Sequence, residues 1–258
     1  MANRIVAFFR EKKENEKALI CYFPVGDPSF DSLHIASLYL DSGTDILEIG
    51  IPVEDPYLDG EVVAESMKRA LEHQDLSATL EIIVQIRREH PDAILQGMCY
   101  KQLFNSISWD KFNDFVIKSG LDGLLVADAD FEEQKDIRNN LNEYVSLLSF
   151  LPFSYNKGDL NNLNDMGEGY VFLQAIDGAT GMRKELDSQL ESKIHMVKQE
   201  VPNVPVCVGF GISNPEHCRQ INNMGADGVI IGSATLNKIA EGDASLVNFV
   251  KECKKALV

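Results

Sequence analysis

The sequence is short of positive charge. Its 258 residues include 24 Lys and Arg against 40 Asp and Glu, which gives a net charge of −16. A field of this sign repels phosphate backbones, so we expect no nucleic-acid partner. An anionic substrate would have to be held by local groups, against the overall charge of the protein.

Long apolar runs and paired cysteines are also missing. No stretch reaches the roughly 20 apolar residues of a membrane span, and the N-terminal segment lacks the apolar core of a signal peptide. The five cysteines are scattered and form no C-x-x-C pair, which argues against a disulfide framework or a zinc site. We therefore expect a soluble, cytoplasmic protein that does not associate with membranes.

What the sequence does contain is a series of eight short apolar runs. Most are too continuous in apolarity to alternate, which is typical of parallel strands buried on both faces. The runs are 19–23, 46–51, 93–100, 123–127, 144–151, 169–175, 205–210 and 228–233.

Segments with helical spacing separate these runs. The first places Leu33, Ile35, Leu38 and Leu40 on an inner stripe and stops at Gly43. Others occupy 77–90, 110–120, 132–144, 213–226 and 243–258.

Two of these helices carry candidate start signals. Ser77 and Glu81 resemble a capping box with imperfect spacing, and Ser213 is a candidate N-cap before Pro215. Eight strands that alternate with helices predict a single (β/α)8 barrel, a TIM barrel, over residues 1–258. The alternative is an open doubly wound sheet, which a G-x-G-x-x-G after the first strand would favour; none is present.

Glycines follow the seventh and eighth strands. Gly209 and Gly211 end one strand, and Gly232 with Ser233 opens a short extra helix after the other. Glycine lets backbone N–H groups approach an anion, and a helix N-terminus adds a partial positive charge. Together these glycines predict a phosphate site built from main chain, although each alone could merely turn the chain.

A third glycine-rich segment follows the sixth strand. Gly178 and Gly181 flank Thr180, as in a mobile lid. Taken alone, this segment reads more simply as a solvent loop.

Two acids stand out around the second strand. Glu48 is the single carboxylate inside an apolar run, and Asp59 lies in the loop that follows. A carboxyl group buried at the barrel mouth would have a raised pKa, which suits proton transfer near neutral pH. The alternatives are an ion pair between Glu48 and Lys101, and a turn-forming role for Asp59 before Gly60.

Four aromatic residues at strand ends predict a flat apolar pocket: Tyr22, Tyr100, Phe172 and Phe210. Each one singly could be core. None of the five histidines lies near a strand end, so neither a metal site nor a histidine-activated nucleophile is supported.

Several motifs resemble those of the tryptophan synthase alpha subunit, the indole-3-glycerol-phosphate lyase family. They are ILEIGIPVEDPYLDG (46–60), GDP (26–28), GFGIS (209–213), GADGVIIGSA (225–234) and the segment 178–181. The resemblance covers nearly the whole chain. It implies a retro-aldol cleavage of indole-3-glycerol phosphate without metal or organic cofactor, and a beta-subunit partner that carries pyridoxal phosphate.

The resemblance also implies roles for particular residues. Glu48 would be the general acid and base, and Asp59 would hold the indole N–H. Thr180 would be the lid residue that closes near Asp59. The implied phosphate-binding residues are Gly181, Gly211, Gly232 and Ser233, and the implied indole pocket is Tyr22, Tyr100, Leu125, Phe172 and Phe210.

Several positions depart from the family pattern: Leu58, Glu61, Ala64, Lys101, Gln102, Asp130 and Phe172. Some of them lie where the family meets its beta subunit, so they bear on the partner more than on the acid pair. Three readings stay open: a lyase in an alpha–beta complex, a stand-alone lyase that releases indole, and a weakly catalytic subunit that activates its partner.

Overall fold

Eight parallel strands close into one barrel in a computed structural model of the chain, which describes residues 3–13, 16–178, 181 and 185–258. The strands follow one another in chain order around the barrel, and β1 pairs with β8 to close it. Their bounds are β1 Ala18–Pro24, β2 Ile46–Gly50, β3 Ile94–Cys99, β4 Gly123–Val126, β5 Ser146–Leu151, β6 Val171–Gln174, β7 Val206–Gly209 and β8 Gly228–Ile231. The predicted (β/α)8 barrel is confirmed, and the open sheet is wrong.

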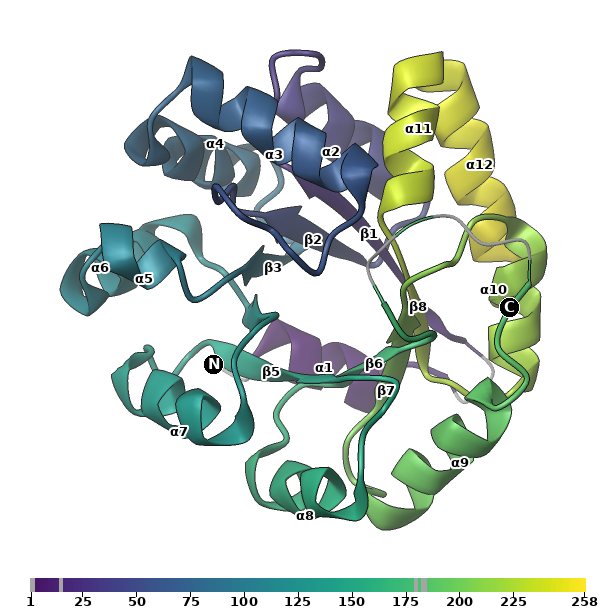
Figure 1. Cartoon of the computed structure of the whole chain (residues 1–258). Helices are drawn as coiled ribbons and strands as arrows, with labels where there is room; N and C mark the ends of the chain where they lie inside the picture. The colour runs from purple at the N-terminus through teal and green to yellow at the C-terminus, as the bar shows by residue number, and fades with distance from the viewer. Residues whose placement is uncertain (1–2, 14–15, 179–180, 182–184) are drawn as a thin grey trace.

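The strands are buried on both faces because helices surround the barrel (Figure 1) and a cluster of buried apolar side chains fills its interior. Every residue of β1 and β2 is buried, as the continuous apolar runs predict. Parallel pairing brings all eight carboxyl ends to one rim, where the connecting loops can build a site.

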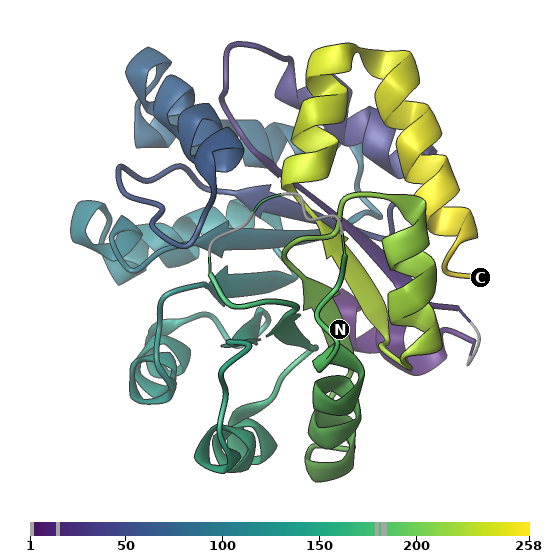
Figure 2. The same ribbon diagram turned by 45° about the vertical axis from the view of Figure 1, so that its right-hand side comes forward.

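The surrounding helices include more than the sequence pattern indicates. Their bounds are α1 Arg4–Glu11, α2 Ser32–Asp41, α3 Glu61–His73, α4 Leu76–Glu89, α5 Leu103–Ser106, α6 Trp109–Ser119, α7 Phe131–Asn140, α8 Lys157–Met166, α9 Leu190–Glu200, α10 Pro215–Asn223, α11 Ser233–Glu241 and α12 Asp243–Lys255. The expected extra helix after the eighth strand is α11, and α12 packs beside it on the outside of the barrel (Figure 2).

Helix α1 packs against the barrel core. A Cβ on Gly123 would lie 2.6 Å from Ile5, which is fully buried, and Phe9 packs on Tyr170 with ring centroids 5.7 Å apart. None of the helices within the described ranges is long and apolar enough to cross a membrane.

The predicted inner stripe of α2 is partly wrong. Ile35 is buried, but the other buried residues of the helix are Ser32, Ala36 and Tyr39. Leu33, Leu38 and Leu40 are only half-buried. Tyr39 turns inward because its ring packs in the core and its hydroxyl donates to the carbonyl of Tyr22 at 3.3 Å.

The two predicted helix starts are displaced by one or two residues. Asp75, not Ser77, caps α4 by accepting from Ala78 N at 2.8 Å. Asn214, not Ser213, caps α10, with Pro215 in the first turn as expected. Ser, Asn and Asp cap helices almost equally well, so where they lie close together the sequence does not decide between them.

Candidate active site

Strand β2 holds Glu48 at the barrel mouth. In the sheet register Glu48 lies between Tyr22 on β1 and Gln96 on β3, and only 3% of its surface is exposed. Burial raises the pKa of its carboxyl group to about 8, the negative charge of Asp59 adds to the rise, and a hydrogen bond from Gln96 opposes it. Glu48 is therefore mostly protonated at neutral pH and close to the point where it can also act as a base.

Two buried polar side chains fix one oxygen of Glu48. Gln96 Nε2 donates to Glu48 Oε1 at 2.7 Å, and the Tyr170 hydroxyl donates to Gln96 Oε1 at 2.5 Å. The Tyr170 contact sets which end of the Gln96 amide faces Glu48, because a hydroxyl donor requires the amide oxygen.

No described cation pairs with Glu48. Lys101 Nζ lies 2.8 Å from Glu133 instead, in an ion pair whose two side chains are each about two-fifths exposed. The alternative of a structural ion pair between Glu48 and Lys101 is therefore wrong.

The loop between β2 and α3 brings Asp59 over the same mouth. Asp59 N donates to Pro56 O at 2.8 Å, and the Tyr100 hydroxyl donates to Asp59 Oδ2 at 2.7 Å. Tyr100 comes from the end of β3, so the barrel itself holds the loop acid. The Asp59 carboxylate therefore has a hydrogen bond from the barrel in addition to any role in forming the turn.

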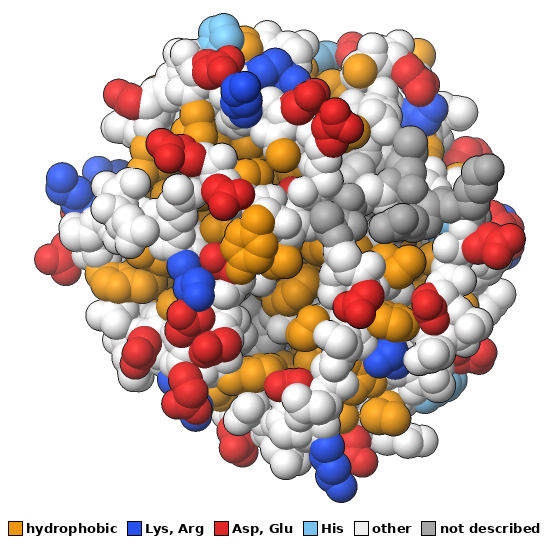
Figure 3. Space-filling model, in the orientation of Figure 1, with side chains coloured by type: hydrophobic (Ala, Val, Ile, Leu, Met, Phe, Trp, Pro, Cys, Tyr) orange, Lys and Arg blue, Asp and Glu red, His pale blue; other side chains and the backbone are white. Residues whose placement is uncertain are grey.

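Glu48 and Asp59 line one cavity of about 560 Å³, counting its open mouth. Its described lining residues are Tyr22, Glu48, Asp59, Val63, Met98, Leu125, Ala127, Phe150, Phe172, Gly181, Phe210, Gly211, Ile212, Ile230, Gly232 and Ser233. Hydrophobic side chains gather around this mouth in the space-filling view (Figure 3). The structure thus brings together every predicted site residue except two: Tyr100, which reaches the site through Asp59, and Thr180, which lies outside the described residues.

Three phenylalanines form one wall. Phe172 lies edge-on to Phe210 with ring centroids 5.7 Å apart, and Phe150 packs on both at 5.4 and 5.7 Å. Among the non-glycine residues that the structure describes, Phe210 alone has a positive φ, +74°. A bulky residue in that region is strained, and such strain is concentrated at functional sites.

Strand-end glycines make room for the aromatic rings. A Cβ on Gly209 would lie 2.3 Å from Phe172, and one on Gly50 would lie 2.3 Å from the Tyr22 hydroxyl. A side chain at either position would displace a ring that lines the cavity, so these glycines let the two rings lie where they do.

The end of the cavity formed by β7 and β8 is built largely from main chain. Gly211, Gly232 and Ser233 line it, and α11 begins at Ser233 with Gly232 as an N-cap that supplies no side-chain hydrogen bond. The N–H groups in the first turn of α11 therefore have no capping side chain and can donate to a bound anion. The buried Ser233 hydroxyl likewise has no partner among the described residues.

Sequence reasoning missed several residues of the site, some in the cavity lining and one, Gln96, that holds Glu48. Gln96 could have been suspected as the one polar residue in the apolar run of β3, in the way that Glu48 was in β2. Phe150, Met98 and Ile230 carry no signal that separates them from core residues.

Three of the departures from the family pattern, Lys101, Gln102 and Asp130, have local partners in this chain. Asp130 caps α7 in a capping box with Glu133, which also binds Lys101. Gln102 accepts from Asp55 N at 3.3 Å and so contacts the acid loop.

Among the side chains that the structure describes, no cluster of three or more His, Cys, Asp or Glu could hold a metal ion.

The fold and the cavity place this chain in the class of (β/α)8-barrel proteins that carry a buried acid at the carboxyl ends of the strands. More narrowly, the sequence model described as "Tryptophan synthase alpha chain" matches residues 8–257, and the chain belongs to that family.

Relatives share about a third of their residues with this chain. The tryptophan synthase alpha chain of Caldanaerobacter subterraneus is 32% identical over 93% of this chain and 92% of its own length. That of Aquifex aeolicus is 33% identical over 98% of both.

Solved structures agree with the fold. A tryptophan synthase structure from Mycobacterium tuberculosis superposes with a TM-score of 0.88 at 26% identity, covering 100% of this chain and 99% of that chain. A structure from Aquifex aeolicus gives 0.88 at 30% identity, with 99% of each chain covered.

Proposed function

We propose that the chain is the alpha subunit of a tryptophan synthase and cleaves indole-3-glycerol phosphate to indole and glyceraldehyde 3-phosphate. The observation that carries the proposal is the environment of Glu48: a buried carboxyl group with a raised pKa, beside a second acid, in a cavity lined mainly by apolar side chains. This environment suits a group that must first give a proton and then take one.

The proton steps follow from the placement of the two acids. Protonated Glu48 gives its proton to C3 of the indole ring, and positive charge develops toward the ring nitrogen. Asp59, held by Tyr100, accepts a hydrogen bond from the indole N–H and so stabilises that charge.

Cleavage reverses the proton flow. Glu48, now a carboxylate, takes the proton of the side-chain hydroxyl next to the ring, and the oxygen forms a C=O bond. The C–C bond to the ring breaks, and its electron pair restores the aromatic indole. Glu48 ends the cycle protonated, as it began.

The phosphate of the substrate is assigned to the main-chain end of the cavity. The N-terminus of α11 at Ser233 and the glycines Gly181, Gly211 and Gly232 surround that end. Glu48 and Asp59 are the charged side chains in the described lining, and they come from β2 and the loop that follows it. Main-chain N–H groups can hold an anion here without any Lys or Arg. A protein with a net charge of −16 can therefore bind a phosphate-bearing substrate.

The aromatic residues and the lid complete the assignment. The indole ring is placed between Leu125, Phe172 and Phe210, with Tyr22 and Tyr100 on the acid side. Thr180, next to Gly181, is assigned to a lid over the ring.

The proposed reaction needs neither metal nor organic cofactor. The protonated indole ring itself accepts the electron pair of the breaking bond, so no external electron sink is required. Pyridoxal phosphate belongs to the beta subunit, which takes up the indole in an alpha–beta complex.

One assay tests this proposal: indole formation from indole-3-glycerol phosphate, measured with and without a cognate beta subunit. We expect activity that the partner increases. Equal activity alone would indicate a stand-alone lyase, and no indole in either case, with a faster beta reaction, would indicate an activating subunit. A Glu48→Gln variant should lose about 10²- to 10⁴-fold in kcat, and full turnover by that variant would remove the mechanism.

A further inference from the structure

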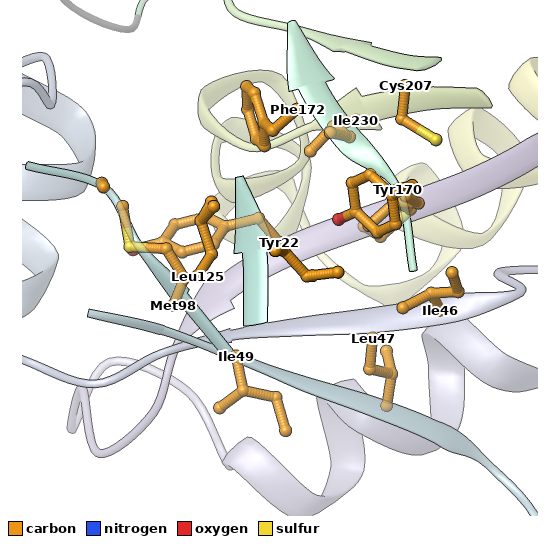
Figure 4. Packing of buried hydrophobic residues seen from close by; sticks show 14 of the residues in the cluster. Tyr22, Ile46, Leu47, Ile49, Met98, Leu125, Tyr170, Phe172, Cys207 and Ile230 are labelled. Atoms are coloured by element: carbon orange, nitrogen blue, oxygen red, sulfur yellow. The ribbon is translucent and has the colours of Figure 1, made fainter. Parts of the chain in front are cut away.

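The hydroxyl group of Tyr22 is buried and has no hydrogen-bond partner among the described residues. Tyr22 is 4% exposed, and it lines the same cavity as Glu48 and Asp59. Figure 4 shows it in the cluster of side chains that includes Met98 and Leu125, which line the cavity with it.

The other buried tyrosines differ from Tyr22. The hydroxyls of Tyr39, Tyr100, Tyr155 and Tyr170 donate to Tyr22 O, Asp59 Oδ2, Lys193 O and Gln96 Oε1, at distances between 2.5 and 3.3 Å. Buried hydroxyls are normally paired, because an unpaired one loses its water without replacement. A phenylalanine would fill the space of the Tyr22 ring without that cost.

The surrounding backbone makes room for this hydroxyl. It lies above Gly50, where a Cβ would come within 2.3 Å of it, and the ring packs against Gly232. Burial raises the pKa of the Tyr22 phenol well above its usual value, and Asp59, Tyr100 and Glu48 reinforce the rise. The group is therefore a neutral O–H donor at physiological pH.

The acid end of the cavity needs such a donor. The polar side chains in the described lining are Glu48, Asp59, Tyr22 and Ser233, and Ser233 begins α11 after β8. Asp59 as a carboxylate only accepts, and Glu48 becomes an acceptor once it has given up its proton. While Glu48 removes the proton of the substrate oxygen, Tyr22 is the lining side chain beside the two acids that keeps its own O–H throughout, so it can donate to that oxygen at every stage.

We propose that the Tyr22 hydroxyl binds the substrate directly, by donating a hydrogen bond to the side-chain oxygen that becomes the aldehyde oxygen. This inference rests on the proposed lyase function. No bond to Tyr22 forms or breaks, and its proton stays on the phenol. Its effect is to stabilise the oxygen while Glu48 removes the hydroxyl proton.

The test compares Tyr22→Phe with the wild type on two ligands. With indole-3-glycerol phosphate, kcat/KM should fall about 10- to 100-fold, mainly through kcat. The inhibition constant of indole-3-propanol phosphate, whose side chain lacks the reacting hydroxyl, should change less than about twofold. The control is Tyr155→Phe, which removes a buried hydroxyl outside the cavity and should leave both constants unchanged.

Two results would overturn the inference. One is wild-type kcat/KM in Tyr22→Phe; the other is an equal loss for substrate and analogue, which would mean that the ring rather than the hydroxyl acts. If the wild type cleaves the substrate and Tyr22→Phe does so equally well, the inference alone fails. If the wild type forms no indole with or without a beta subunit, the proposed function itself fails, and this inference with it.

Discussion

The two ends of the cavity use different chemistry. At the β1–β3 end, side chains carry the polar groups: Glu48, Asp59 and Tyr22, with Gln96 and Tyr170 behind them. At the β7–β8 end the described lining offers glycine backbone, one serine and the first turn of α11.

The proposed reaction accounts for this difference. A group that must change its protonation state needs a tunable pKa, and burial beside another acid supplies it at Glu48. An anion that only has to stay in place can be held by fixed N–H groups, which do not titrate. A protein with a net charge of −16 can therefore hold a phosphate and keep two acids in one cavity.

The largest effect that we expect is at the acid end: the free energy of unfolding should depend on pH through Glu48. The Glu48 carboxyl ionises near pH 4.5 in the unfolded chain and near pH 8 in the folded protein. Between these values the folded state keeps a proton that the unfolded state has lost, so the contribution of Glu48 is full below pH 4.5 and is lost as the pH rises through 8. The loss is on the order of 5 kcal/mol.

Urea unfolding of wild type and Glu48→Gln at several pH values measures this loss. The wild type should become less stable relative to the variant as the pH rises from about 5 to 8, because glutamine cannot ionise. Parallel curves for the two proteins would contradict a raised pKa at Glu48.

A new charge at the main-chain end should have a smaller effect, and one limited to the binding of the phosphate-bearing substrate. Ser233→Asp puts a carboxylate at the first position of α11, where it suits the helix dipole but repels a phosphate. We expect KM for indole-3-glycerol phosphate to rise about tenfold or more, while the affinity for indole stays within about twofold.

The matched control is Ser233→Asn, which adds similar volume without the charge. If both variants weaken substrate binding equally, the effect is steric, and the anion site lies elsewhere.

The smallest effect should come from Lys101. Its ion pair with Glu133 lies away from Glu48 and is partly exposed, so Lys101→Met should change the free energy of unfolding by less than about 1 kcal/mol. Indole formation by the isolated chain should not change. A large loss of kcat would mean that Lys101 acts on the acid end after all.

Much of the barrel could be predicted from the sequence because its strands are buried on both faces. Continuous apolar runs mark all eight strands, and the one carboxylate among them marks Glu48. The glycines after β7 and β8 mark the other end of the cavity, because close approach of backbone is what glycine permits.

The remainder depends on neighbours that only the fold brings together. Gln96 reaches Glu48 through the β2–β3 register, and Tyr170 reaches Gln96 across the barrel, so no spacing in the sequence links them. The predicted stripe on α2 is partly wrong for a related reason: Tyr39 carries a polar hydroxyl, yet it is buried because the core supplies a hydrogen-bond acceptor. The partnerless hydroxyl of Tyr22 also has no sequence signal, since it depends on what surrounds it.

The proposed proton transfer is tested most directly by measuring the pKa of Glu48. Carbon-13 NMR of protein labelled in its glutamate carboxyl groups, titrated with pH, gives this value, and Glu48→Gln identifies the signal by its loss. The account predicts a midpoint near 8. A midpoint near 4.5, the ordinary value for a glutamate, would contradict it, because the carboxyl would then hold no proton to give at neutral pH.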